Sequence, residues 1–152
     1  MVTPLEADPA GKLRSATARH AFGAVGAAPT DGDALAVLLV HEFQHTKLGA
    51  VLDLCDLFDP TYRASLRVSW RRDERPVEGA LQGTYAHLGV TDVWRARAQI
   101  AGPGQAQALQ LFRQYRDWTS NAVDALLNTG ALTPAGTQFV SRMAQTLAAW
   151  PA

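Results

Sequence analysis

The apolar positions along the chain recur mostly at helical spacing, and they predict a domain built mainly from α-helices. The clearest segment runs from about residue 31 to 58. It begins with acidic residues, continues through the apolar stretch Ala34–Val40 and stops at Asp59-Pro60. Because that stretch is apolar on every side of a helix, we expect the helix to be buried.

Three further helices are predicted downstream, over about residues 76–98 and 105–128 and from Pro134 onward. An apolar and aromatic stripe on the second of these is more typical of core than of a ligand-binding face; it comprises Leu109, Phe112, Tyr115, Trp118, Val123 and Leu126. Alternation from Leu66 to Trp70 predicts one short strand. The apolar spacing over residues 12–24 favours a first helix. The predicted architecture is a compact, mainly helical domain with at most a short strand or small sheet.

Composition narrows the class of protein. The 152 residues fit a single domain, in which residues 1–25 are either peripheral or the remnant of a longer chain. The net charge is zero, so the basic face of a nucleic-acid binder is not expected. Cys55 is the one cysteine, which excludes a disulfide framework and suggests a small buried residue. We expect neither a signal peptide nor a membrane-spanning stretch, and with a single cysteine a reducing, cytoplasmic setting fits best. The scarcity of Lys beside plentiful Ala and Arg suggests a bacterial origin.

The central helix carries the sequence His41-Glu42-Phe43-Gln44-His45. Two histidines four residues apart lie on one face of a helix, one turn from each other. That spacing suits two imidazole ligands of a single metal ion. The pattern therefore predicts a metal site, although hydrogen-bonded core histidines in a non-catalytic domain would give the same spacing.

A third protein ligand has to come from elsewhere in the chain. Metzincins place it on the same helix, but Leu48 and Val51 occupy the corresponding positions here. Glu78 would serve in a zinc peptidase of the thermolysin type. We favour His87, because the small residues one and two turns before it, among them Gly83, would let its helix approach the metal helix closely.

Two blocks of sequence resemble one protein family. Residues 41–54, HEFQHTKLGAVLDL, look like the metal helix of the HExxH-type peptide β-hydroxylases that use 2-oxoglutarate. The second block covers residues 70–76, WRRDERP, and 79–90, GALQGTYAHLGV; the chain end around residues 130–136 is similar too. Arg72 and Glu74 depart from the family pattern, in which an acid and a proline are expected at this loop.

The resemblance implies a non-haem Fe(II), 2-oxoglutarate-dependent dioxygenase that hydroxylates a side-chain β-carbon of a ribosomally made precursor peptide. Iron would be held by His41, His45 and His87, a variation on the usual two-histidine, one-carboxylate triad. The partner implied is a radical-SAM enzyme, present as a separate protein or as a fused domain missing from this sequence.

The far carboxylate of 2-oxoglutarate requires a bidentate cation, for which Arg75 is our first choice and Arg71 our second. A solvated, self-paired charge cluster is the alternative interpretation of this loop. Gln82 and Tyr85 are expected to line the pocket. Glu42 would support the site as a neighbour of the ligands or as an extra ligand.

Two other functions fit the same residues. One is a zinc-dependent metallopeptidase in which Glu42 is the general base. The other is a non-catalytic module that binds a precursor peptide for a partner enzyme. Metal and cofactor dependence distinguishes all three functions.

Overall fold

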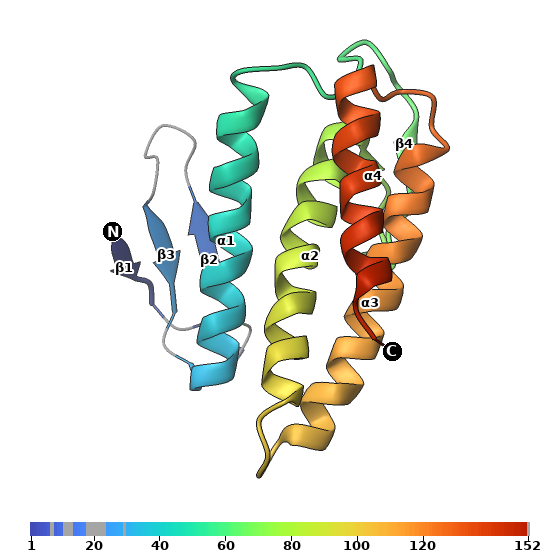
Figure 1. Ribbon diagram of the computed structural model, residues 1–152. Helices are drawn as coiled ribbons and strands as arrows, with labels where there is room; N and C mark the ends of the chain where they lie inside the picture. Colours follow the sequence, from blue (N-terminus) through green and yellow to red (C-terminus); the bar gives the residue numbers. More distant parts are fainter. Residues whose placement is uncertain (7, 11–13, 18–23, 29, 152) are drawn as a thin grey trace.

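The fold is mainly helical, as predicted. The computed structural model describes residues 1–6, 8–10, 14–17, 24–28 and 30–151. Its helices are α1 (Gly32–Leu52), α2 (Val77–Ala98), α3 (Gln105–Leu127) and α4 (Pro134–Ala149). Figure 1 shows α1 between a small sheet on one side and α2 on the other, with α3 and α4 beyond α2. The central helix therefore has packing partners on two faces, which explains why its sequence lacks one clear polar face.

The first part of the chain forms a sheet in place of the expected helix. β1 (Val2–Pro4) pairs in parallel with β3 (Val25–Ala27), and β2 (Ser15–Thr17) pairs with β3 in antiparallel register. The prediction of a helix over residues 12–24 is therefore wrong for residues 14–17 and 24; residues 12–13 and 18–23 lie outside the described part of the chain. β2 and β3 both contact α1, so the secondary structure of this region depends on contacts between segments that are distant in the sequence.

Helix α1 ends at Leu52, six residues earlier than the sequence predicts. Phe58 forms a β-bridge with Leu132, and the Leu57 carbonyl accepts a hydrogen bond from the Thr133 amide. These contacts hold the segment after α1 in a non-helical path toward the start of α4. Cys55 lies exposed in that segment, so its expected burial is also wrong.

The segment before α2 forms a small hairpin whose strands have two residues each. β4 (Ser65–Leu66) pairs with β5 (Arg75–Pro76), so the predicted strand over Leu66–Trp70 is confirmed at its first residue, while Trp70 lies in a turn. Both strands of this hairpin contact α2. The loop arginines and Trp70 are thereby placed beside the helix that carries His87.

The hydrophobic core lies mainly among α2, α3 and α4. Its most deeply buried side chains are Leu48, Leu81, Val90, Val123, Leu126 and Val140. The aromatic stripe of α3 is partly core as predicted, because Phe112 is buried. None of the described helices combines the length and apolar character needed to cross a membrane.

Candidate metal centre

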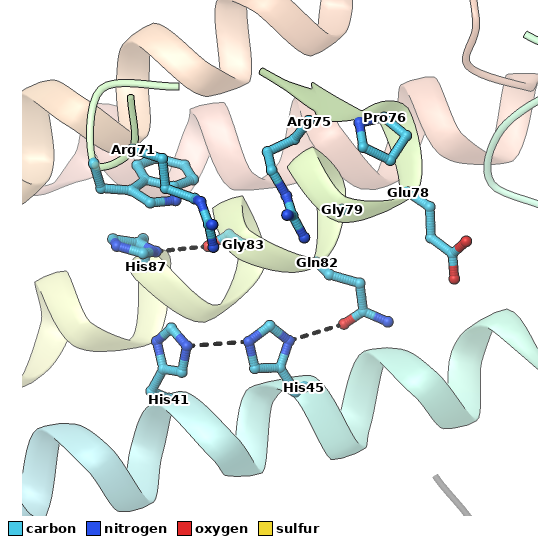
Figure 2. A pocket seen from close by; sticks show the side chains of 11 residues that line it. His41, His45, Arg71, Arg75, Pro76, Glu78, Gly79, Gln82, Gly83 and His87 are labelled. Carbon is cyan, nitrogen blue, oxygen red and sulfur yellow. Dashed lines mark hydrogen bonds between the residues drawn. The ribbon is translucent and has the colours of Figure 1, made fainter. Parts of the chain in front are cut away.

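A cavity of about 630 Å³ lies between α1, α2 and the loop before α2. Its lining includes the three predicted metal ligands, the two loop arginines and Gln82 (Figure 2); the full set is His41, His45, Trp70, Arg71, Arg75, Pro76, Glu78, Gly79, Gln82, Gly83 and His87. Its size is typical of a small-molecule site. Residues from both blocks of the sequence thus meet in one cavity.

His41 and His45 form a close pair on successive turns of α1. Their Nε2 atoms are 3.1 Å apart, in hydrogen-bonding contact. Two nitrogens at right angles around one ion, each at about 2.1 Å from it, would be about 3 Å apart. The spacing of the pair therefore suits two neighbouring ligands of a single ion. Burial and the nearby His45 lower the pKa of His41, against the opposing effect of Glu42, which favours the neutral form that a ligand needs.

Gln82 of α2 contacts the opposite side of the His45 ring. Its Oε1 atom is 3.1 Å from His45 Nδ1. An amide oxygen only accepts hydrogen bonds, so Nδ1 must carry the hydrogen and Nε2 the lone pair. The nitrogen directed at His41 is consequently the one that is able to bind a metal.

His87 packs against two aromatic rings. Trp70 stacks on it with ring centres 4.0 Å apart and planes 17° apart, and Tyr115 of α3 lies 5.7 Å away on a similar plane. Its Nδ1 donates to the Gly83 carbonyl oxygen over 2.8 Å. Burial lowers the pKa of His87 to about 4, despite that hydrogen bond. The imidazole is therefore neutral at ordinary pH, with its lone pair on Nε2.

The three imidazoles are near one another without yet having the spacing of three ligands. The ring centres of His41 and His87 are 5.6 Å apart, compared with 4.7 Å for His41 and His45. Within the described residues, no group of three His, Cys, Asp or Glu side chains is already close enough to hold one ion. Binding of one ion by all three histidines would require the His87 ring and the α1 pair to come closer together.

The two loop arginines differ in how firmly they are paired. Arg71 forms a double hydrogen bond with the Asp73 carboxylate, at 2.9 and 3.1 Å, and this contact lowers the pKa of Asp73. Arg75 is 3.7 Å from the same carboxylate. Its guanidinium lies over Gly79, where an added Cβ would be 3.2 Å from Arg75 Nε. The self-paired cluster that the sequence left open thus describes Arg71 better than Arg75.

Two predicted site residues lie away from the cavity. Glu42 is buried on the sheet side of α1, where its carboxylate accepts a 2.7 Å hydrogen bond from the Ser15 hydroxyl of β2. Tyr85 packs against Phe139 of α4, with ring centres 5.3 Å apart. Neither side chain lines the cavity that contains the histidines.

The close approach of α1 and α2 depends on a different glycine from the one we expected. A Cβ added at Gly83 would lie 3.1 Å from Trp70, so Gly83 makes room for that ring. At Gly89, an added Cβ would come within 2.9 Å of Gln44 and Val40 on α1. Gly89, in the second block of the sequence, therefore permits the helix contact, and Gly83 permits the stacking on His87.

Sequence reasoning did not assign Trp70 to the site. The signal available was its position directly before Arg71, at the end of the alternating segment, but its stacking partner follows only from the fold. The comparisons with known proteins add no family: no protein-family model matches the chain, and no curated protein sequence matches it. The case for function therefore depends on the residues of this cavity.

Proposed function

We propose that the protein is a non-haem Fe(II), 2-oxoglutarate-dependent hydroxylase of a ribosomally made precursor peptide. The observation that carries the proposal is one cavity lined by three imidazoles and two guanidinium groups. Imidazoles suit Fe(II), and a guanidinium suits a carboxylate. A cavity of about 630 Å³ has room for more than a five-carbon keto acid, which leaves space for part of a peptide.

His41, His45 and His87 would hold the metal through their Nε2 atoms. The hydrogen on Nδ1 of His45 is directed at Gln82 and that of His87 at Gly83, so both rings present a lone pair at Nε2. When bound, Fe(II) with 2-oxoglutarate and O₂ supplies the oxidising power to insert one oxygen atom into a C–H bond, while the keto acid becomes succinate and CO₂. The chain's own contribution is to fix the ligands and exclude water.

Arg75 is the better anchor for the far carboxylate of the keto acid. It makes only a long contact with Asp73, whereas Arg71 is held by Asp73 through two hydrogen bonds. To form a bidentate pair with the keto acid, Arg71 would have to break its hydrogen bonds with Asp73. We therefore expect Arg75→Met to weaken 2-oxoglutarate binding by about 10- to 100-fold, and Arg71→Met to weaken it less, measured by calorimetry on the metal-loaded protein without oxygen.

The position of Glu42 favours the hydroxylase over a zinc peptidase. A general base must reach the proton that it removes, directly or through one water. Glu42 is instead hydrogen-bonded to Ser15 on the sheet side of α1. We propose that it stabilises the packing of β2 on the metal helix, with no part in proton transfer.

The proposal is tested by turnover of the keto acid. Purified protein given Fe(II), O₂ and ¹³C-labelled 2-oxoglutarate is expected to form labelled succinate, and His45→Ala is expected to abolish it. Mass spectrometry of a co-expressed precursor peptide is then expected to show one added oxygen atom. Peptide cleavage with Zn(II) alone would favour the metallopeptidase. Peptide binding without any metal dependence would favour the non-catalytic module.

The proposed partners follow from the same reaction. The precursor peptide is the substrate. A radical-SAM enzyme that acts on the same peptide is the partner, either as a separate protein or as a fused domain. The reaction takes place in a bacterial cytoplasm. Because Cys55 is the one cysteine, this sequence lacks the three thiolate ligands of such an enzyme's cluster.

A further inference from the structure

We propose that Gln82 is a positioning residue that fixes the tautomer of His45 and so prepares its Nε2 atom for the metal. The inference rests on the proposed metal site and goes beyond it by assigning a role to a residue that is not a ligand. The contact that carries it joins Gln82 Oε1 to His45 Nδ1 over 3.1 Å, from α2 to α1.

A free neutral imidazole carries its hydrogen on either nitrogen. If the hydrogen of His45 were on Nε2, the ring would present no lone pair to an ion beside His41. The amide oxygen of Gln82 stabilises the hydrogen on Nδ1, which leaves Nε2 as the acceptor. Partners of this kind fix ring orientation in metal sites and raise ligand basicity.

The geometry of the His41–His45 pair gives the same assignment. Their Nε2 atoms are 3.1 Å apart, so one of them carries the shared hydrogen in the metal-free protein. With the Nδ1 hydrogen of His45 held by Gln82, that shared hydrogen belongs to His41. Binding of an ion at both Nε2 atoms would then require only the His41 ring to transfer its hydrogen from Nε2 to its own Nδ1, by way of solvent, because His45 is already in its binding form.

Two consecutive residues of α2 act in parallel. The Gln82 side chain accepts from His45, and the Gly83 backbone carbonyl accepts from His87. Figure 2 shows the two acceptors on adjacent positions of the same helix, facing the imidazoles from α1 and α2. The backbone acceptor is fixed by the helix, whereas the side-chain acceptor is set by residue type. Substitution at Gln82 therefore isolates this effect.

The test compares Gln82→Leu, Gln82→Asn and Gln82→Glu. Leucine removes the acceptor, asparagine withdraws it by one methylene, and glutamate keeps an acceptor at the same reach. Gln44→Leu is the matched control, because Gln44 is half-buried between the same helices and lies outside the cavity lining. Two quantities are measured: the ¹⁵N chemical shifts of His45 in the metal-free protein, and the dissociation constant for Co(II) from its visible absorption.

We expect wild type and Gln82→Glu to show His45 protonated on Nδ1 and to bind Co(II) with similar affinity. Gln82→Leu and Gln82→Asn are expected to show mixed tautomers and to bind Co(II) about 10- to 100-fold more weakly. Gln44→Leu is expected to leave both quantities unchanged. If Gln82→Leu fails to fold, the wild-type tautomer together with the asparagine and glutamate variants decides the question.

Two results would overturn the inference and leave the metal site intact. One is a Gln82→Leu variant that binds Co(II) as tightly as the wild type does. The other is a metal-free wild type in which His45 carries its hydrogen on Nε2. A wild type that binds no Co(II), and whose absorption matches that of His41→Ala, would instead refute the proposed function together with this inference.

Discussion

Trp70 lies flat on the His87 imidazole, with ring centres 4.0 Å apart. The contact removes water from one face of the imidazole, and burial is the main cause of the low pKa of His87. We expect Trp70→Leu to raise the pKa of His87 toward 6.5, measured by NMR titration of the metal-free protein. Because Trp70 is half-buried, the free energy of unfolding should fall by about 2 kcal/mol.

Trp118→Leu provides a matched control for that substitution. Trp118 is also half-buried, and its ring contacts Tyr115, one ring further from His87. The control is expected to lose comparable stability while the pKa of His87 stays near 4. Equal pKa shifts in the two variants would contradict a specific effect of the Trp70 contact.

The stability of the metal-free protein is expected to depend on pH below neutrality. The pKa of His87 is about 4 when folded and 6.5 as the ordinary value, so the unfolded chain binds more protons between these limits. The stability that depends on His87 being neutral is therefore fully present above pH 6.5. It is lost as the pH falls toward 4, and the loss for this group is about 3 kcal/mol. Urea unfolding with a chelator present, at pH 7.5 and pH 4.5, measures the loss. His87→Gln should make the profile flatter; an unchanged profile would contradict the assignment.

The same substitution at two glycines should have opposite effects on stability. A Cβ at Gly136 would overlap the Leu57 carbonyl oxygen, which is fixed by its hydrogen bond from Thr133. Gly136→Ala is therefore expected to lower the free energy of unfolding by more than about 3 kcal/mol. A Cβ at Gly49 of α1 meets no neighbour, so Gly49→Ala should raise it by about 0.5–1 kcal/mol. Thermal unfolding followed by circular dichroism compares the two, and similar changes would be inconsistent with the packing.

Two cavity residues are candidates for the third metal ligand, and the Co(II) affinities of their variants distinguish them. His87 and Glu78 both line the cavity, and the sequence left both open with His87 favoured. We expect His87→Gln to weaken Co(II) binding by about 100-fold, whereas Glu78→Gln should change it less than threefold. The reverse order would make Glu78 the ligand and would return the site to the usual two-histidine, one-carboxylate set.

Helices α2 and α3, and the start of α4, were predictable to within a residue because local signals mark these boundaries. Pro76 and Pro134 stand at two starts, while Gly102, Gly104 and Gly130 adopt positive φ in the connections. The end of α1 was missed because it depends on Leu57 and Phe58 pairing with residues more than seventy positions away. The β1–β3–β2 sheet was missed because strands of three residues carry too little periodicity.

For the site, residue types and spacing were enough to bring His41, His45 and His87 into one hypothesis, and the family resemblance added Gln82; the fold places all four on one cavity. The direction of Glu42 was not predictable, because it depends on Ser15 in a strand that the sequence did not reveal. The difference between Arg71 and Arg75 likewise depends on where Asp73 lies. Motif spacing thus predicts which face of a helix a residue occupies, and long-range packing decides its partners.

The most direct test of the central claim is visible absorption during anaerobic addition of Fe(II) and 2-oxoglutarate. If the imidazoles hold the metal beside the arginines, a charge-transfer band is expected only when both are present. His41→Ala and His45→Ala should abolish the band, and Arg75→Met should require more keto acid to produce it. No band in the wild type, or an equal band in the histidine variants, would contradict the account.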